Sequence, residues 1–323
     1  MPLQIIAEIG NNHGGDIYLA KKMSAAAIDA GADLIKFQIY DIENFIAPGN
    51  QYYDELKRET MTFDEFRILK EYVESLGAHF LATPFESKSL TFLNELKMSQ
   101  IKISSGDFDN IDLIEQAIEY GMRLIISLGG SDNNQIDQTV EFLKRKNADF
   151  TLLHCVLSYP AKMADVNLSF IDTLKKRYKI PIGYSDHTEG IEASLGAIAL
   201  GAEIIEKHFT TDRSLPGGDN EMSILPHEMN RLCTEGKNIS KAIGMKDRIP
   251  SEAEFFIKKL VQRVYHAKSD IPNGDKLASQ NIHLLRPKKP GVGFFAEKKI
   301  YLLNKRASRN IIAGEVITQN VII

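Results

Sequence analysis

Short apolar runs of β character alternate with longer stretches of helical period along most of this chain. Eight such runs lie at residues 5–10, 34–40, 79–84, 101–106, 123–129, 150–155, 180–186 and 204–210. Between them, segments such as YLAKKMSAAAIDAGA and FDEFRILKEYVESLGA place apolar residues at helical spacing. Eight strands, each followed by a helix, predict an α/β fold, namely a (β/α)8 TIM barrel. A doubly wound open sheet is the alternative, and the number of strands favours the barrel.

The pattern changes after residue 243. The next segment, GMKDRIPSEAEFFIKKL, is polar and charged, as expected of a linker. Beyond it we predict short strands and turns, with strands in RVYHAKS, NIHLLRP and KIYLLNK. Two stretches, DIPNGDKLASQNI and NIIAGEVITQNVI, resemble each other, which indicates a small module built on an internal repeat. We therefore predict a barrel domain at 1–245, a linker at 246–263 and a small β-rich domain at 264–323, whose size suits covering a site more than catalysis.

Composition excludes several classes of partner. The net charge of −4 is spread along 323 residues, so no bulk attraction to nucleic acid or to an anionic membrane is expected. Cys155 and Cys233 are too few for a disulfide framework, which fits a reducing compartment. The first residues lack a basic region and cleavage site, and no apolar run reaches the roughly 18–20 residues of a membrane span. We expect a cytoplasmic protein.

Polar residues lie on or just after nearly every predicted strand. In TIM barrels, active sites form where the strands end and the following loops begin. The residues at these positions are Glu8, Asn12, His13, Lys36, Gln38, Thr83, Lys102, Ser104, Ser105, Asp107, Ser127, His154, Tyr159, Ser185, Asp186, His187, Lys207 and His208. A purely structural barrel needs no such set, so their accumulation predicts an active site.

Two lysines stand inside strands between apolar neighbours, Lys36 in LIKFQ and Lys102 in IKISSG. A buried lysine is costly unless an anion accompanies it. One interpretation is an internal salt bridge, for example from Lys36 to Glu8. A second is a pair of fixed cations that hold a substrate with phosphate and carboxylate groups, aided by neutral hydroxyl donors. The donors would be Thr83, Ser105 and Ser185. A third interpretation makes Lys102 a Schiff-base nucleophile, as in barrel aldolases.

His187 and His208 end two successive strands, with an Ala-rich helix between them. Two imidazoles that converge from adjacent strand ends could bind a divalent metal. Carboxylates and water in the remaining positions would favour manganese or magnesium. The alternative is a pair of rim histidines bonded to loop carbonyls. His154 is expected to be a buried, hydrogen-bonded barrel residue.

Six segments together resemble the N-acetylneuraminate (sialic acid) synthase family, which includes legionaminic and pseudaminic acid synthases and spore-coat polysaccharide enzymes. They are IIAEIGNNHGGDIYLAKKM, GADLIKFQIY, FLATPFE, IKISSGD, GYSDHTEG and LGAIALGAEIIEKHFTTDRSLPGGD. The resemblance covers essentially the whole chain, and the C-terminal part is similar to the family's antifreeze-like (SAF) domain.

The resemblance implies a transferase that condenses phosphoenolpyruvate with an N-acetylated hexose such as N-acetylmannosamine and releases phosphate. It also implies a divalent metal, with manganese expected first and magnesium or cobalt as alternatives. Members of the family form domain-swapped homodimers in which the SAF domain covers the partner's active site. A Schiff-base aldolase or lyase that uses Lys102 and a non-catalytic carbohydrate-binding protein are the rival functions.

The resemblance also implies residue roles. The phosphoenolpyruvate contacts would be Lys36, Thr83, Lys102, Ser105 and Ser185. The metal ligands would be His187 and His208, with Glu8 and Asp107 as further catalytic residues. The sugar site or the metal's water shell would be lined by Glu8, Gln38, Asn50, Asp107, Tyr159 and Asp219. Either Arg286 or Lys289 would replace the family's SAF-domain arginine.

The barrel part of the sequence departs from the family pattern at three places. Leu128, Gly129 and Gly130 follow Ser127, where relatives read Ser-Thr-Gly-Met. Leu157 stands where a polar residue is common near phosphoenolpyruvate, and Asp107 stands where relatives often have Glu. Together with the change in the SAF domain, where Lys288 and Lys289 stand in place of a Lys-Arg pair, these departures predict that the acceptor can differ from N-acetylmannosamine.

Overall fold

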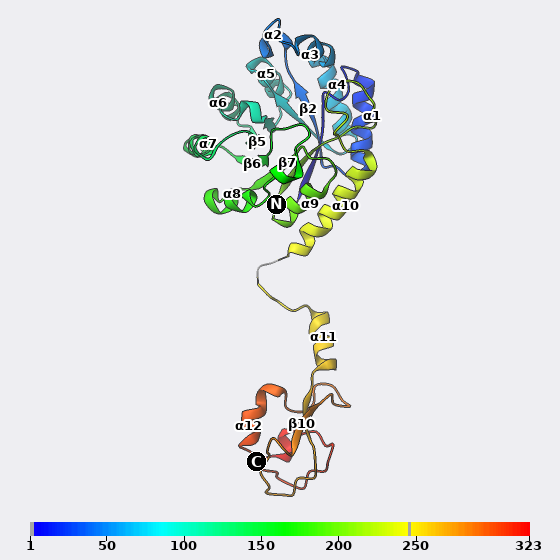
Figure 1. Cartoon of the computed structure of the whole chain (residues 1–323), viewed down its shortest axis with the longest axis vertical. Helices are drawn as coiled ribbons and strands as arrows, with labels where there is room; N and C mark the ends of the chain where they lie inside the picture. The colour runs from blue at the N-terminus through cyan, green and yellow to red at the C-terminus, as the bar shows by residue number, and fades with distance from the viewer. Residues whose placement is uncertain (1–2, 245–246) are drawn as a thin grey trace. The chain divides into compact units, whose positions relative to one another are not determined.

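The computed structural model describes residues 3–244 and 247–323, which form two compact units, one on each side of this gap (Figure 1). The predicted boundary between residues 245 and 246 lies outside the described residues. Each unit has its own hydrophobic core.

The first unit is a nearly closed barrel of eight parallel strands, in the order β3-β2-β1-β8-β7-β6-β5-β4. The strands are β1 (Gln4–Gly10), β2 (Leu34–Ile39), β3 (His79–Pro84), β4 (Gln100–Ile103), β5 (Arg123–Ser127), β6 (Phe150–Cys155), β7 (Ile182–Asp186) and β8 (Ile204–His208). The two end strands, β3 and β4, lie beside each other and so almost complete the circle. The barrel predicted from the sequence is confirmed, and the open doubly wound sheet is wrong.

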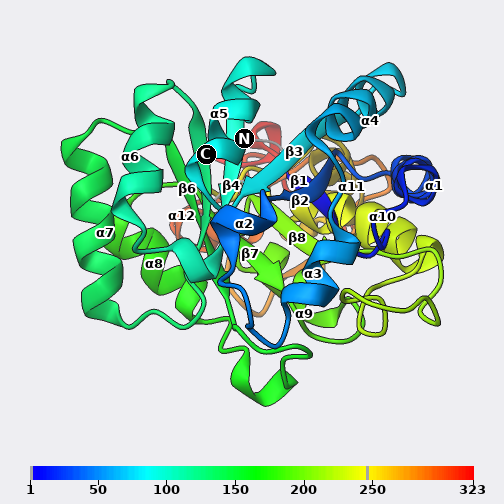
Figure 2. The same cartoon turned by 90° about the horizontal axis from the view of Figure 1, so that it is seen from above.

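Helices surround the strands (Figure 2). The longer ones are α1 (Ile17–Asp29), α4 (Phe63–Ser75), α5 (Ser87–Glu95), α6 (Ile111–Glu119), α7 (Asn133–Arg145), α8 (Phe170–Tyr178), α9 (Glu192–Ala199) and α10 (Pro226–Ile243). Two short helices, α2 (Ile42–Phe45) and α3 (Tyr53–Glu59), interrupt the connection between β2 and α4. Local sequence sets several helix starts. For example, Thr62 and Glu65 form a capping box that satisfies backbone donors at the first turn of α4.

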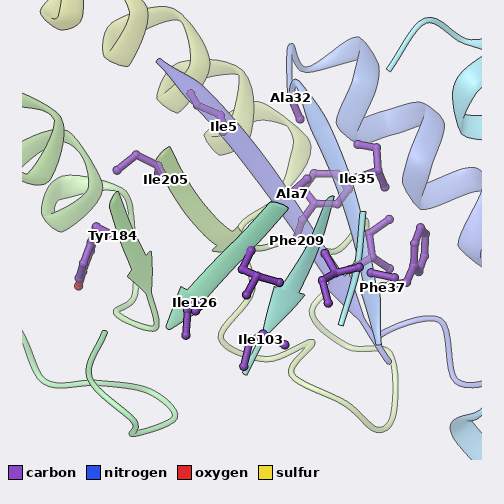
Figure 3. Close-up of a cluster of buried hydrophobic side chains, with 14 of the residues drawn as sticks. Ile5, Ala7, Ala32, Ile35, Phe37, Ile103, Ile126, Tyr184, Ile205 and Phe209 are labelled. Carbon is purple, nitrogen blue, oxygen red and sulfur yellow. The ribbon is translucent and has the colours of Figure 1, made fainter. Parts of the chain in front are cut away.

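The strand period of two divides the side chains between the two faces of the barrel. Outward residues such as Ile5, Ala7, Ile35 and Phe37 pack in the main hydrophobic core (Figure 3). A smaller, separate cluster forms an apolar layer on the inward face: Ile6, Leu34, Leu81, Ile125, Leu153 and Ile204. Two residues further along these strands the inward positions are Glu8, Lys36, Thr83, Ser127, Cys155 and Glu206. The interior therefore changes from apolar to predominantly polar within one step of the pleat.

A second group of polar residues lies on the outward face. Asp186 and Lys207 each come one residue after an inward-facing residue, Ser185 and Glu206, and therefore face outward. Both side chains are fully buried, and Lys207 Nζ lies 3.2 Å from Asp186 Oδ2. Asp186 also accepts hydrogen bonds from Ser194 of α9 (2.6 Å) and from the backbone N–H of Thr188 (2.8 Å). Asp186 and Lys207 were expected among the strand-end residues of the active site. The structure places them behind the barrel wall instead, because adjacent residues of a strand face opposite sides.

The second unit contains an antiparallel pair, β9 (Val264–Ala267) and β10 (Ile282–Leu285), with the helices α11 (Glu252–Val261) and α12 (Lys299–Leu303). The two similar segments detected in the sequence meet through reciprocal backbone hydrogen bonds between Ile271 and Ile311 (2.8 and 2.9 Å). Leu277 and Ile317 occupy equivalent places in the two segments, and both are buried in the core of this unit. The internal repeat therefore builds the module.

Two local details differ from the predictions or refine them. KIYLLNK was expected to be a strand, but Lys299–Leu303 is helical, with Leu302 buried and Ile300 exposed. An apolar run this short fits either period, so the prediction of a strand was wrong. The segment predicted as a linker contains α11.

No helix in residues 3–244 and 247–323 is long and apolar enough to cross a membrane.

The buried Asp186–Lys207 pair predicts a large stability effect. Replacing Lys207 by Met keeps the volume but leaves the Asp186 carboxylate without its cation, so the free energy of unfolding should fall by about 3–5 kcal/mol. Urea denaturation followed by circular dichroism measures this change. The control is Lys176→Met, which removes an exposed partner of Asp172 and should cost less than about 1 kcal/mol. Equal effects of the two substitutions would contradict the prediction.

Candidate active site

A cavity of about 200 Å³ lies at the carboxyl ends of the barrel strands, above the inward polar layer. Ten of the predicted site residues line it: Glu8, Lys36, Gln38, Thr83, Lys102, Ser105, Tyr159, Ser185, His187 and His208. A larger cavity, about 690 Å³, opens at the amino ends of the strands beside Asp33, His79 and Lys237. We assign the site to the smaller cavity because it lies at the carboxyl ends of the strands, and because its two lysines, two glutamates and two histidines are all buried.

The centre of the cavity is a cluster of four buried charged side chains. Lys36 Nζ lies 3.1 Å from Glu8 Oε2 and 3.3 Å from Glu206 Oε2. Lys102 Nζ lies 3.9 Å from Glu206 Oε1. The ion pair between Lys36 and Glu8, the first of the three lysine interpretations, is therefore present. It does not exclude the second, a pair of cations that hold a substrate, because an arriving anion could share the same cations.

Glu206 was not identified from the sequence. It accepts a hydrogen bond from Ser185 Oγ (2.7 Å) and sits between the two lysines. The signal was available, because Glu206 precedes His208 by two residues in a strand and must share its face. The sequence analysis named Lys207 as a site residue instead, but Lys207 lies between Glu206 and His208 and faces the other side of the strand.

Burial and mutual attraction set the protonation states of this cluster. Burial lowers the pKa of Lys102 to about 8, although Glu206 opposes the shift. Burial raises the pKa of Glu8 to about 7 and outweighs the attraction of Lys36. Burial also acts to raise the pKa of Glu206, but Lys102 and Lys36 together bring it down to about 2. The pKa of Lys36 lies above its ordinary value because Glu206 and Glu8 overcome the effect of burial. Near neutral pH the cluster has two cations, one full carboxylate and one partly protonated carboxyl, which leaves positive charge for an anion.

The two histidines converge as the sequence suggested. Their ring centroids lie 5.4 Å apart, and both residues are buried. Burial lowers the pKa of His187 to about 4 and that of His208 to about 3. Both rings are therefore neutral at physiological pH, which is the form that binds a metal.

The ring nitrogens fit metal ligation. His187 Nδ1–H donates to the carbonyl oxygen of Val156 (2.8 Å), which leaves the lone pair of Nε2 free. Such a bond orients most metal-ligating histidines. His208 Nδ1 has no hydrogen-bond partner among the described residues and lies 3.3 Å from Asp219 Oδ2. Within those same residues no group of three His, Cys, Asp or Glu side chains has metal-binding geometry, so the metal stays a prediction.

Asn12 holds the loop that supplies Asp219. Its Nδ2 donates to the carbonyl oxygen of Phe209 and to Ser223 Oγ, both at 2.9 Å, and its Oδ1 accepts the N–H of Asp219 at 2.7 Å. Gly218, at φ +53°, lies so close that a Cβ there would stand 2.8 Å from Asn12 Oδ1. The loop after β1 therefore fixes the loop after β8 beside His208.

Tyr159 forms one wall of the cavity. Its ring stacks on His187 with centroids 4.1 Å apart and meets His208 edge-on at 5.9 Å. The side chain is nevertheless half exposed, so it reaches from the histidines to the mouth of the cavity. It can pack against a substrate while it orients the histidine rings.

The segment that departs from the family pattern lies at the same mouth. The N–H of Gly129 donates to Ser105 Oγ (3.0 Å). A Cβ at Gly129 would stand 2.8 Å from that oxygen and 3.1 Å from Cys155 Sγ, so only glycine fits without a shift. Leu157, half exposed, adds an apolar surface to an otherwise polar cavity.

Five residues that the resemblance implies for the site do not line this cavity: Asp219, described above, and the four that follow. Asp107 accepts hydrogen bonds from Ser104 Oγ (2.7 Å) and Asn110 Nδ2 (3.0 Å) in the loop after β4. Asn50 is exposed, and its Oδ1 accepts the N–H of Tyr52. Arg286 and Lys289 are exposed residues of the second unit. Their roles stay predictions. His154 is buried and hydrogen-bonds through Nε2 to the carbonyl oxygen of Val166 (2.6 Å), as expected of a barrel residue.

Comparison with known proteins identifies the family. Residues 23–248 match the NeuB family, and residues 262–322 match the SAF domain. The chain is 35% identical to N,N'-diacetyllegionaminic acid synthase of Campylobacter jejuni, over 98% of each sequence. It is 34% identical to human N-acetylneuraminate-9-phosphate synthase, over 84% of this chain and 80% of that protein.

A solved structure agrees with these matches. The N-acetylneuraminic acid (sialic acid) synthetase of Leptospira borgpetersenii, crystallised with citrate, is 44% identical, with a TM-score of 0.76, over 80% of this chain and 90% of that one. The resemblance inferred from the sequence motifs is confirmed. The chain therefore belongs to the NeuB family, and its C-terminal part is a SAF domain.

Proposed function

We propose that this protein is a nonulosonic acid synthase, a transferase that joins phosphoenolpyruvate to an open-chain N-acetylated hexose and releases phosphate. The observation that supports this most directly is the buried Lys36–Lys102 pair with an excess of positive charge, placed beside two neutral histidines. Relatives over most of the chain are named as synthases of sialic and legionaminic acids.

Lys36 and Lys102 would hold the phosphate and carboxylate groups of phosphoenolpyruvate. Two hydroxyl groups already contact this charged cluster. Thr83 Oγ1 accepts a hydrogen bond from Lys36 Nζ (3.2 Å), and Ser185 Oγ donates one to Glu206 Oε1 (2.7 Å). They can turn to donate to an anion without moving the backbone. Positioning and fixed positive charge would supply most of the rate enhancement.

His187 and His208 would bind the divalent metal, with Asp219 close enough to His208 to contact the ion or its water. A bound divalent ion, manganese in the first place and magnesium or cobalt as alternatives, supplies Lewis-acid chemistry at the aldehyde oxygen of the sugar. Tyr159 stacks on His187 and would keep its free Nε2 directed at the site.

Glu8 is placed to handle a proton. In the proposed reaction, carbon 3 of phosphoenolpyruvate forms a bond to the aldehyde carbon, and carbon 2 becomes electron-poor. The aldehyde oxygen is left as an alkoxide. Water adds to carbon 2, and the tetrahedral centre then expels phosphate to give a ketone. Of the two protons of this water, one ends on the alkoxide and the other on the departing phosphate. With a pKa near 7, Glu8 can stabilise the positive charge as a carboxylate and take a proton from the attacking water.

A Schiff-base enzyme is the rival with some support from the structure. The pKa of Lys102, near 8, would leave part of the amine neutral at physiological pH. However, Lys102 Nζ donates to the carbonyl oxygen of Ile103 and faces Glu206, and this mechanism gives the histidine pair no role. A non-catalytic sugar-binding protein has no use for the two buried cations.

A homodimer is part of the proposal. Phe255, Phe256 and Ile257 of α11 are 51%, 62% and 53% exposed in a single chain. Adjacent exposed side chains of this size mark an interaction surface. A second copy of the chain, exchanged as in the domain-swapped dimers that the resemblance implies, would cover them, and its Arg286 or Lys289 would then face the acceptor.

The function is tested by phosphate release from phosphoenolpyruvate with manganese, across a panel of N-acetylated hexoses. We expect release with one sugar, loss of release on chelation, and at least a 100-fold loss in His208→Ala with reduced manganese binding by electron paramagnetic resonance. This follows because one of only two imidazole ligands is removed. His227→Ala, an exposed histidine, is the control and should retain activity. Metal-dependent activity in His208→Ala would contradict the ligand assignment.

Phosphoenolpyruvate affinity should depend on pH through Lys102. Below pH 8 the amine of Lys102 is charged, and any change of affinity there should come from Glu8, whose pKa is about 7. Above pH 8 binding must recover a proton, so affinity should fall by up to about tenfold per pH unit. Calorimetry between pH 7 and 9.5 measures this, and Lys102→Met should bind weakly without that slope.

Lys237→Met is the matched control, because Lys237 pairs with Asp33 at the other end of the barrel. Borohydride trapping of substrate on Lys102, with activity insensitive to chelators, would instead support the Schiff-base enzyme.

The dimer is tested by light scattering during gel filtration. We expect a mass of twice 36.2 kDa for the wild type and a shift to the monomer mass in Phe256→Glu, which places a charge in the apolar surface of α11. Ile68→Glu, on the exposed side of α4, is the control. A monomeric wild type would rule out the domain-swapped dimer.

A further inference from the structure

A second cavity adjoins the active site. It has a volume of about 420 Å³ and shares Gln38 with the site cavity. Asp219, which lies 3.3 Å from His208 Nδ1, also lines it. We call this cavity the vestibule. Other residues that line it are Asn11, Phe45, Tyr52, Glu55 and Glu59. A substrate whose reacting end lies at the histidines can therefore extend into the vestibule.

One buried group in the vestibule lacks a partner. Asn11 is only 8% exposed; its Nδ2 donates to Tyr40 Oη (3.1 Å), while its Oδ1 accepts no hydrogen bond from the described residues. An unsatisfied buried acceptor costs free energy. It points to a ligand that brings a donor, such as a sugar hydroxyl or an amide N–H.

The other lining groups suit a sugar as well. Tyr52 and Phe45 line the vestibule with aromatic side chains, which suit contact with the apolar side of a sugar or with an acetyl methyl group. The carboxylates of Glu55 and Glu59 are acceptors for hydroxyl donors. Glu59 is held in place because its Oε1 accepts the N–H of Gly218 (3.0 Å).

The charge of the vestibule is opposite to that of the inner site. Glu55, Glu59 and Asp219 line it, and no lysine or arginine of the described chain does. Two cations of α3, Lys57 and Arg58, are exposed and do not line the cavity. Lys57 Nζ lies 3.9 Å from Glu43 Oε1. Burial raises the pKa of Glu59 and outweighs Arg58, which acts to lower that pKa. A further cavity of about 240 Å³ shares Asp219 with the vestibule and is also lined by Glu189 and Glu221. Its lining residues in the described part of the chain include no lysine or arginine.

We infer that the vestibule binds the distal end of the acceptor and that the acceptor is an uncharged, unphosphorylated amino sugar. This rests on the proposed function. A phosphate ester at the distal end of the acceptor would lie among the carboxyl groups of Glu55, Glu59 and Asp219. Repulsion between like charges would weaken its binding. The inner lysines are committed to the other substrate. The names of the relatives differ in this respect. The human protein is named as the synthase of a 9-phosphate, and the name of the Campylobacter protein contains no phosphate.

The test compares N-acetylmannosamine with its 6-phosphate ester as acceptors for the full chain with manganese and phosphoenolpyruvate. We expect kcat/KM for the ester to be at least about 100-fold lower. Glu55→Lys should narrow this ratio by about tenfold or more, because it reverses one charge of the vestibule. The control Glu141→Lys makes the same charge change on the exposed side of α7 and should leave the ratio unchanged. Equal or better use of the ester by the wild type would overturn the inference, as would an unchanged ratio in Glu55→Lys.

Binding separates this inference from the proposed function. Saturation-transfer NMR detects weak sugar binding whether or not phosphate is released. We expect signals from the free sugar, their loss in Asn11→Leu, and none from the ester. A protein that releases no phosphate with any acceptor, yet binds only the free sugar, would disprove the synthase and support the vestibule. Binding of the ester with equal strength would disprove the vestibule assignment whatever the reaction.

Discussion

The active site depends on keeping four charged side chains stable inside a barrel that excludes water. Lys36 and Lys102 can be buried because Glu206 lies between them and Glu8 completes the group. Each lysine alone would lose its proton or destabilise the fold. Together, and with the Glu8 carboxyl partly protonated, they keep an excess of positive charge on an apolar floor. The same interaction that permits burial therefore provides the site for an anion.

Both histidines are fixed from behind by a second set of charges. His187 and His208 face the cavity, while the residues just before them, Asp186 and Lys207, form a buried pair on the outer side of the barrel wall. The carboxylate of this pair also accepts hydrogen bonds from the turn that follows His187. Because consecutive residues face opposite sides, each of the two strands carries one residue of the buried ion pair and, directly after it, one histidine of the site. Stability of the wall and geometry of the site are coupled because they share the same backbone.

Charge divides the site into two regions. The cations Lys36 and Lys102 lie in the inner cavity, inside the barrel. Carboxyl groups line the vestibule and the neighbouring cavity. In the proposed reaction, this division of charge would hold an anionic donor and an uncharged acceptor side by side. Asn12 and Gly218 maintain this arrangement by joining the loop after β1 to the loop after β8.

The sequence by itself determined the barrel, the repeat in the small module, the family, and most of the residues at the strand ends. These follow from short-range patterns, namely the period of apolar positions and the order of motifs. Only the tertiary structure decided that Glu206 faces the site and Lys207 does not, since alternation gives two faces without saying which is inside. It also decided that Asn11 and Glu59 share a cavity with Asp219, because contacts between residues this far apart in the chain depend on closure of the barrel. Short apolar runs such as that of α12 fit both periods, and there the packing around Leu302 made the choice.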